Sequence, residues 1–385
     1  MKKQKLKEPS RRNPIRAARA DEKLKSLPNK AGDSNPSTSA SGQNIQSTKK
    51  RLKRPLTCYN GIGNAIDWFI IFTSPGGKYY LYYDNIMLAQ RKKKMTLCKT
   101  NIYADNTAFR RTYDQFDIIK EQKGALCLVH NNQHNTPPPQ REFAHMKGMV
   151  LFKGEQGIFI SHSVPIFPKL ENVHGIATNG DTKSQHFFCC NINKKGLEVI
   201  SEHFWTAHPD IYFKIVPEEY LSIGKMREVF HGNFRTNFVP FLEGDLETRG
   251  GFKFEIYTRT HSDAKKLQYS PSIWDNLMST YSQSFVVQSH YKDSELCHKC
   301  IANAKYKITN VEATCVKVAG KNWEYIWKHT SDHSKIGFSE GSDIFCISDL
   351  NHTATQKTRG GSIYCFVDED LVGAIQNTLE FKWDI

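Results

Sequence analysis

The sequence predicts an α/β protein in which sheets are covered by helices, and it predicts that the fold is built from two related halves. Apolar runs of strand length alternate with segments of helical character, which is typical of that class. Of the 385 residues, 39% are hydrophobic and 12% aromatic, so the chain can supply a large core. Features that repeat at one fixed offset indicate the two halves.

The repeated feature is a His-x-Lys unit, which occurs as His145-Met146-Lys147 and again, 188 residues later, as His333-Ser334-Lys335. Eighteen residues before each histidine an apolar run contains a cysteine, Cys127 in one case and Cys315 in the other. We interpret these two runs as matching strands. A single His-x-Lys is a weak signal, because a solvated strand face can carry it. Two units on a common frame indicate a duplication.

Two further features follow the same frame. Eighteen residues after each histidine stands a short polar residue, Ser163 in the first case and Asn351 in the second. At about the same offset, the strand-like run Trp68–Thr73 has a counterpart in Glu255–Thr260. We expect Ser163 and Asn351 to support the two units as hydrogen-bond donors.

Residues 1–57 differ from the rest in composition. They contain no aromatic residue and carry 16 lysines and arginines against four acidic residues, so they account for +12 of the formal net charge of +14. Such a segment cannot bury enough apolar surface to offset the entropy of ordering, so we predict a disordered basic tail. The remainder of the chain is close to neutral.

The basic run Lys49–Arg54 permits several interpretations. It fits a nuclear address, a nucleic-acid contact, a solvated charge run, or a dibasic processing site just before the fold. No apolar stretch of signal-peptide length follows Met1, and the strongest apolar run is too short to span a bilayer, so no membrane association is expected. Ten cysteines, in contrast, suit a disulfide-bearing protein. The signals for the compartment therefore conflict.

In the first half we expect a strand over 66–73, a turn at 74–77 and a second strand over 79–83. The basic run 91–94 either faces phosphate or is solvated. A loop at 131–139 precedes the first His-x-Lys unit, and a hairpin follows it over 149–160. A helix is predicted over 197–204, a strand over 210–216, and a bridge between the halves over 218–250.

In the second half we expect a strand over 252–260, a helix over 274–279 and a strand at 286–287. The second His-x-Lys unit then enters another hairpin, and a strand over 362–366 leads to a helix near 370–379. On both hairpins the period of two places the histidine and the lysine of each unit on one face.

Two histidines and two lysines brought into one cleft suit a phosphodiester. One neutral histidine can attack phosphorus while the other, protonated, donates to the leaving oxygen; the roles reverse when water resolves the covalent intermediate. The lysines stabilise the developing oxyanions, so no metal and no cofactor are required. Because one histidine must be protonated, we expect activity at mildly acidic pH. Which histidine is the nucleophile stays open.

Longer motifs around these units resemble signatures of the deoxyribonuclease II family. His145–Gly148 followed by His162–Pro168 is similar to the first signature of that family. Asp332–Lys335, Asp349–Asn351 and Arg359–Gly361 before Cys365 are similar to the C-terminal signature. Asp67–Phe69 resembles the N-terminal strand. The resemblance extends from about Cys58 to about Phe366.

The resemblance implies a phospholipase-D-like pseudo-dimer, whose halves we place at 58–235 and 236–385, each with a central sheet covered by helices. It also implies a metal-independent acid endonuclease that cuts DNA through a phosphohistidine intermediate and leaves 3′-phosphates. Family members are usually lysosomal or secreted, whereas the tail favours the nucleus as the alternative. By motif, the catalytic residues are His145, Lys147, His333 and Lys335.

The resemblance further implies the disulfides Cys58–Cys189 and Cys346–Cys365, with Cys190 as an alternative to Cys189. The catalytically silent alternative is a protein that keeps the fold as a nucleic-acid-binding or secreted effector protein.

Three groups of residues have other interpretations. Cys297 and Cys300 are half a zinc site, a disulfide or free thiols; Cys127 and Cys315 are core residues; and His162, His174 and His290 are surface or structural. Asn351 also begins the only Asn-x-Ser/Thr sequence, so glycosylation would fall on a proposed site residue.

Overall fold

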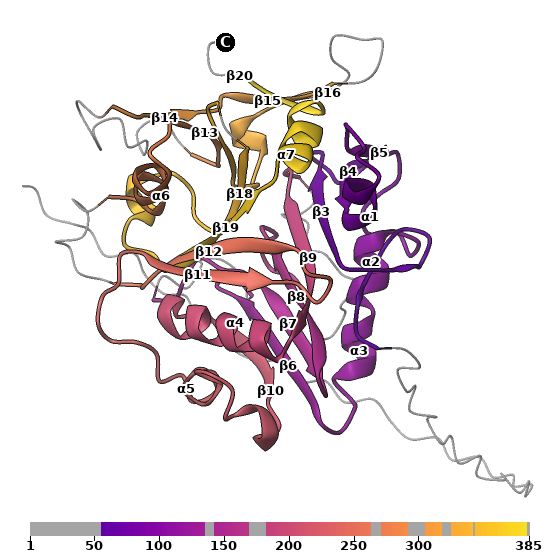
Figure 1. Cartoon of the computed structure of the whole chain (residues 1–385), viewed down its shortest axis with the longest axis vertical. Helices are drawn as coiled ribbons and strands as arrows, with labels where there is room; N and C mark the ends of the chain where they lie inside the picture. Colours follow the sequence, from indigo (N-terminus) through magenta and orange to yellow (C-terminus); the bar gives the residue numbers. More distant parts are fainter. Residues whose placement is uncertain are drawn as a thin grey trace, which may run out of the picture. The chain divides into compact units, whose positions relative to one another are not determined.

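Two large sheets organise the computed structural model (Figure 1), which describes residues 55–134, 142–168, 182–262, 271–291, 305–317, 325–341 and 343–382. All of these residues belong to the unit formed by Lys49–Ile385. No helix in the described part of the chain is long and apolar enough to cross a membrane. The predicted tail up to residue 54 lies outside the described residues, as do His174, Cys297 and Cys300.

The first sheet has eight strands, and all of its neighbouring strands are antiparallel. Their order across the sheet is β10 (Ile211–Ile215), β6 (Ala125–Asn131), β7 (Lys147–Lys153), β8 (Gln156–His162), β9 (His186–Asn193), β3 (Trp68–Thr73), β4 (Tyr80–Asp84) and β5 (Thr96–Cys98). A separate short pair is formed by β1 (Cys58–Tyr59) and β2 (Ala65–Ile66).

The second sheet has seven strands, in which only the β13–β14 pair is parallel. Their order is β11 (Leu242–Glu247), β12 (Lys253–Arg259), β19 (Gly361–Val367), β18 (Ile344–Ser348), β17 (Ile336–Ser339), β13 (Phe285–Gln288) and β14 (Ile308–Asn310). A third, small sheet contains β16 (Tyr325–Lys328), β15 (Ala313–Val316) and β20 (Leu379–Lys382).

The predicted helices are present and begin at capping side chains. α4 (Lys194–Ala207) begins after Asn193, whose side chain accepts from the Gly196 N–H, and α6 (Ile273–Tyr281) begins with a capping box between Ser272 and Asp275. The other helices are α1 (Asn85–Ala89), α2 (Ala108–Tyr113), α3 (Gln115–Ile119), α5 (Met226–His231) and α7 (Glu369–Gln376), with 3₁₀ turns at Glu218–Tyr220, His329–Ser331 and Ala354–Gln356.

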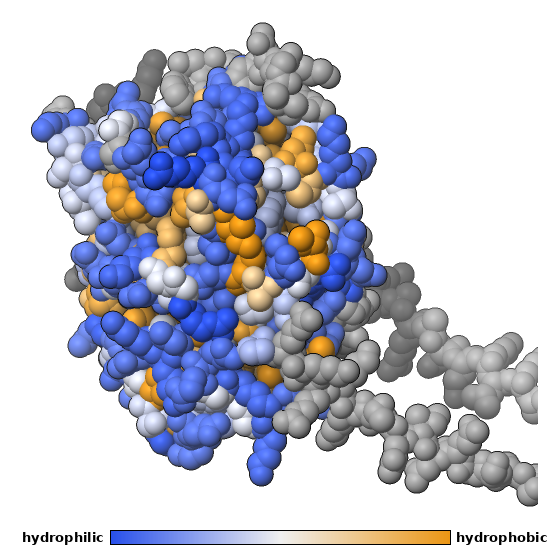
Figure 2. Space-filling view, turned by 45° about the vertical axis from the view of Figure 1, so that its right-hand side comes forward, coloured by the Kyte–Doolittle hydropathy of each residue, from blue (hydrophilic) through white to orange (hydrophobic). Residues whose placement is uncertain are grey.

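The two large sheets share one apolar core. Aromatic rings from the first sheet meet rings from the second, with centroid distances of 5.6 Å for Phe159–Tyr364 and 5.2 Å for Phe188–Phe254. On their other faces, α2 and α3 cover the first sheet and α6 covers the second (Figure 1). The face of the molecule shown in Figure 2 is mostly hydrophilic with scattered apolar patches, because many apolar side chains are buried in these cores. The predicted α/β class with covered sheets is confirmed.

Five strands of each large sheet follow the same order. β3-β9-β8-β7-β6 in the first sheet corresponds to β12-β19-β18-β17-β13 in the second, with antiparallel pairing throughout both sets. The predicted match of Trp68–Thr73 with Glu255–Thr260 is confirmed, since these runs form β3 and β12. The predicted match of the Cys127 and Cys315 strands is wrong, because β15 pairs with β16 and β20 in the small sheet. An apolar run shows that a strand is buried and leaves its pairing partners open.

Both predicted disulfides are present, Cys58–Cys189 and Cys346–Cys365. Cys190 is a buried free cysteine on the opposite face of β9. Cys127 and Cys315 are buried free cysteines, as expected for core residues.

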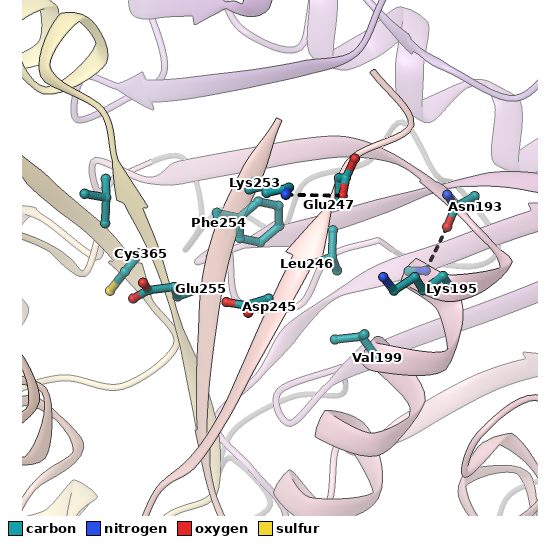
Figure 3. A pocket seen from close by; sticks show the side chains of 12 residues that line it. Asn193, Lys195, Val199, Asp245, Leu246, Glu247, Lys253, Phe254, Glu255 and Cys365 are labelled. Carbon is teal, nitrogen blue, oxygen red and sulfur yellow. Dashed lines mark hydrogen bonds and ion pairs between the residues drawn. The ribbon is translucent and has the colours of Figure 1, made fainter. Parts of the chain in front are cut away.

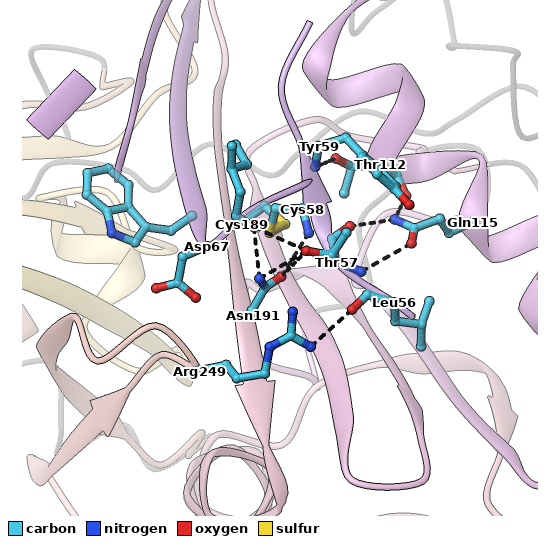
Figure 4. The surroundings of a disulfide bond; sticks show 12 residues. Leu56, Thr57, Cys58, Tyr59, Asp67, Thr112, Gln115, Cys189, Asn191 and Arg249 are labelled. Carbon is cyan, nitrogen blue, oxygen red and sulfur yellow. Dashed lines mark hydrogen bonds between the residues drawn. A yellow bond between two sulfur atoms is a disulfide. The ribbon is translucent and has the colours of Figure 1, made fainter. Parts of the chain in front are cut away.

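Figure 4 shows how the first disulfide anchors the start of the fold: the Cys58 N–H donates to Asn191 Oδ1 at 2.8 Å and the Thr57 N–H donates to Gln115 Oε1 at 3.2 Å. Leu56 and Thr57, which the composition placed in the tail, are buried. Their burial extends the ordered part of the chain slightly beyond the composition boundary.

Candidate active site

His145 lies between the two large sheets, just before β7. Its backbone N–H donates to the Gly360 carbonyl at 2.8 Å, and its Nδ1 lies 2.7 Å from the Asp349 carbonyl oxygen. Since a carbonyl oxygen only accepts, Nδ1 must carry the proton. In the neutral ring, Nε2 then carries the lone pair that a nucleophile or a base needs.

His333 precedes β17 of the second sheet, and residues of the first sheet hold it. Its backbone N–H donates to the Ser184 carbonyl at 2.8 Å, and the backbone N–H of Lys335 lies 3.2 Å from His186 Nδ1. Ser184 precedes β9 just as Gly360 precedes β19, the equivalent strand. Each His-x-Lys unit is therefore attached to the other sheet, and each lysine lowers the pKa of the histidine in the other unit.

The two site lysines are buried, with side-chain nitrogens held by oxygen acceptors. Lys147 Nζ donates to Asn132 Oδ1 at 2.9 Å, and Lys335 Nζ donates to the His333 carbonyl at 2.5 Å. Burial lowers the pKa of Lys147 well below its usual range, and the neighbouring charge of Lys335 lowers it further. Burial also lowers the pKa of Lys335, to about 8. The two ammonium groups thus share one buried region.

Both site histidines are surrounded by positive charge. Burial first, and then Lys147, Lys335 and Arg359, lower the pKa of His145 well below its usual range. Burial, followed by Lys335, His290, Lys147 and Lys183, lowers the pKa of His333. Burial and the neighbouring cations therefore favour the neutral form of both imidazoles. An anion bound among these groups would favour the protonated form of either ring.

Asp349 is a site residue that sequence reasoning assigned no role. Its carboxylate accepts from the Ser362 N–H at 3.0 Å, and its N–H donates to the Ser362 carbonyl at 2.9 Å. Burial raises the pKa of Asp349 to about 7, and the Ser362 hydrogen bond, Lys147 and Lys335 oppose this rise. Asp349 is thus a buried acidic group in a region rich in cations, and Asp332 is another that acts on Lys335.

Ser163 makes the same contacts in the first half: its Oγ accepts from the His186 N–H at 3.0 Å and its N–H donates to the His186 carbonyl at 3.2 Å. The structural counterpart of Ser163 is therefore Asp349, and the predicted pairing of Ser163 with Asn351 is wrong. The second hairpin is two residues shorter than the first, so a constant offset fails beyond it. The Asn351 N–H lies 3.3 Å from Gln356 Oε1.

The structure shows the surroundings of three histidines whose roles the sequence left general or unassigned. The His290 ring lies 4.8 Å from the His333 ring, edge to face, so His290 belongs to the site region. His186, which received no assignment, bonds to Lys335. His162 is buried against Phe167 and Phe187, which agrees with a structural role. No sequence signal marks His186 or His290, because each contacts a residue that is distant in the sequence. His186 bonds to Lys335, and His290 packs against His333.

The site region differs from a cavity near the start of α4. That cavity, of about 510 Å³, is lined by polar and apolar residues of α4, β11, β12 and β19 (Figure 3), and it contains none of the predicted catalytic or supporting residues. Across the described ranges, no group of three or more His, Cys, Asp or Glu side chains is arranged to hold a metal ion.

Comparison with known proteins identifies the family of the chain. The family model described as Deoxyribonuclease II matches residues 57–381, which include both His-x-Lys units. The chain belongs to the deoxyribonuclease II family. The family predicted from the repeated units is confirmed, and with it the assignment of the chain as a deoxyribonuclease II-type endonuclease.

Relatives in this family come from distant animals. Deoxyribonuclease-2 of Caenorhabditis elegans is 22% identical over 80% of this chain and 88% of its own length. Deoxyribonuclease-2-beta of Mus musculus is 24% identical over 80% of this chain and 87% of its own length. Plancitoxin-1 of Acanthaster planci is 22% identical over 84% and 91%, respectively. The similarity thus covers nearly the whole folded unit.

Proposed function

We propose that this protein is a metal-independent acid endodeoxyribonuclease, which hydrolyses DNA phosphodiesters through a phosphohistidine intermediate to 3′-phosphate products. The observation that supports the proposal is that each of the two His-x-Lys units is attached by a backbone hydrogen bond to the sheet of the other. His145, Lys147, His333 and Lys335 act as the catalytic residues, and Ser163 and Asn351 as supporting residues.

In the first step, the neutral histidine attacks phosphorus and forms a P–N bond while the bond from phosphorus to O5′ breaks. The second histidine, protonated, gives its proton to O5′, which leaves as a hydroxyl. In the second step, water attacks phosphorus, its proton passes to the second histidine, and the P–N bond breaks. The product keeps the phosphate on O3′, and both histidines return to their starting states.

The lysines supply the positive charge for the transition state. Their ammonium groups face the oxygens that gain charge, in a buried region where such charge acts strongly. Because the pKa of Lys335 is about 8, its charge is present at acidic pH and is lost as the pH rises through that value. Together with the need for one protonated histidine, this favours activity under mildly acidic conditions.

The equivalent strand orders support a phospholipase-D-like pseudo-dimer with halves at 58–235 and 236–385. We place the enzyme in lysosomes or outside the cell, in keeping with the family, and we keep the nucleus as the alternative that the basic tail favours. DNA is the proposed substrate.

The test is nicking of plasmid DNA by the purified full chain in EDTA at about pH 5, with release of 3′-phosphate ends. We expect cutting in the wild type and none in the His333→Ala variant. Cutting that survives in the variant would refute this mechanism. Binding of DNA without any cutting by the wild type would support the alternative, a catalytically silent nucleic-acid-binding or secreted effector protein.

A further inference from the structure

We propose that Arg359 is a positioning residue of this site, which fixes the chain segment that carries His145 and places a permanent positive charge beside that histidine. The proposal rests on the proposed function. Neither the family match nor the sequence motifs give Arg359 a role, although it stands next to the glycine that receives the His145 N–H.

Arg359 grips the approach to His145 through two hydrogen bonds. Its Nε and Nη2 donate to the Phe143 carbonyl oxygen at 3.0 and 2.7 Å, and the side chain is only 9% exposed. The next residue, Gly360, accepts the His145 N–H at 2.8 Å. Arg359 and Gly360 thus bind the backbone of Phe143 and His145. Because the guanidinium group is planar, its two hydrogen bonds also fix the orientation of the Phe143 carbonyl.

Close packing keeps this part of the second half in place. A Cβ at Gly360 would lie 2.0 Å from the Ala207 carbonyl oxygen and 2.9 Å from the His261 nitrogen. On the first-half side, the Ala144 N–H donates to the His208 carbonyl at 2.8 Å. The segment before His145 therefore runs between fixed neighbours, and Arg359 closes the remaining side.

The charge of Arg359 acts on His145 together with several other groups. Those that face His145 are Lys147 at the start of β7, Lys335 before β17 and Asp349 after β18, and the imidazoles of His208 and His261 lie by the adjoining backbone. Arginine stays charged at every working pH. Its charge lowers the pKa of both His145 and Lys147, and so it favours neutral His145 under acidic conditions.

The other half has a related but weaker arrangement. Lys183 precedes β9 as Arg359 precedes β19, and Lys183 Nζ donates to the Thr330 carbonyl, three residues before His333. Lys183 also lowers the pKa of His333. Lys183 is only partly buried, so solvent screens its charge more than that of the buried Arg359, and it has no second donor in a fixed plane. The comparison singles out Arg359 as the stronger clamp.

Two substitutions separate the grip from the charge. Arg359→Lys keeps the charge and loses the fork, so we expect kcat to fall about tenfold with little change in KM and with the acid limb of the pH profile unmoved. Arg359→Gln loses the charge, so the pKa of His145 rises and the acid limb moves upward by about one pH unit. Rates are measured on plasmid DNA with the full chain, and thermal unfolding checks the fold of each variant.

A second measurement does not depend on activity. Titration of the His145 ring by NMR, assigned with a His145→Gln variant, is expected to shift to higher pH in Arg359→Gln and to stay in place in Arg359→Lys. The matched control is Arg249→Gln, which removes another arginine that donates to a backbone carbonyl, that of Leu56; it should leave both readouts unchanged.

The outcomes distinguish this inference from the proposed function. An unchanged His145 titration in Arg359→Gln, or rates reduced by one factor at every pH, would overturn the charge role. A wild-type kcat in Arg359→Lys would overturn the positioning role of the Arg359 hydrogen bonds. If the titration shifts as expected but the wild-type chain cuts no DNA, the electrostatic inference stands and the proposed function fails.

Discussion

The two halves of the fold share five strands in the same order, yet they surround their His-x-Lys units with different side chains. Equivalent positions hold Ser163 and Asp349, His186 and Ser362, Lys183 and Arg359, and, just beyond the ends of β6 and β13, Asn132 and His290. The second half therefore contributes the buried carboxylate and the guanidinium. The two sheets share one strand order, whereas side-chain differences give the two histidines unequal surroundings.

Unequal surroundings are what a two-histidine mechanism requires, because one ring must be neutral when the other is protonated. His145 has its Nδ1 proton fixed by a carbonyl and lies near three cations. His333 packs edge-on against the His290 ring. The halves are thus expected to respond differently when equivalent residues are changed.

The largest effect is expected from the two histidines. His145→Ala and His333→Ala should each lower kcat by at least about a thousandfold, because each ring acts in both steps. Quenching in alkaline detergent, which preserves the acid-labile P–N bond, and isolation of a phosphohistidine from either variant would assign the nucleophile to the histidine that remains. A variant that keeps more than a tenth of wild-type kcat would show that the halves do not act together.

The next largest effect is expected from the lysines. Lys147→Met and Lys335→Met should each lower kcat by about a hundredfold to a thousandfold with a smaller change in KM, because their charges act mainly in the transition state. Steady-state rates at about pH 5 measure this. The exposed Lys253→Met is the control, and it should behave as the wild type. An equal loss of kcat in the two lysine variants would mean that the two lysines do not contribute to the difference between the two His-x-Lys units.

Asp349→Asn tests the asymmetry through stability. The pKa of Asp349 is raised to about 7 in the folded protein, so the folded state binds more protons than the unfolded state, and wild-type stability from this group falls as the pH rises from about 4 to 7. The free energy of unfolding of the variant relative to the wild type should therefore increase by about 3 kcal/mol across that range. Urea unfolding at both pH values measures this. A difference that stays constant with pH would contradict the buried-carboxylate assignment.

The smallest effect is expected at Ser163. Ser163→Ala removes the Oγ that accepts from the His186 N–H, and it should lower kcat by about tenfold, since one backbone donor is left without a partner. Asn351→Ala, at the position that sequence spacing paired with Ser163, should have a different pH dependence because it is not the structural counterpart. Matching pH profiles of the two variants would restore the original pairing.

Much of the fold could be predicted from local patterns. The strands at 66–73 and 252–260 and the helices at 197–204 and 274–279 appear within β3, β12, α4 and α6, since periodicity and capping residues act over short distances. The match between the Cys127 and Cys315 strands failed for the opposite reason. Pairing depends on register with distant strands, and an apolar run carries no information about it.

The sequence by itself determined that two His-x-Lys units lie on a duplicated frame, because spacing and residue type are properties of the chain. Only the tertiary structure decided which residues surround them. Asp349, His186, His290 and Arg359 reach the site through contacts that join segments far apart in the sequence. A two-residue difference in hairpin length was enough to move Asn351 out of the position of Ser163, because side-chain placement follows hydrogen-bond register rather than a constant offset.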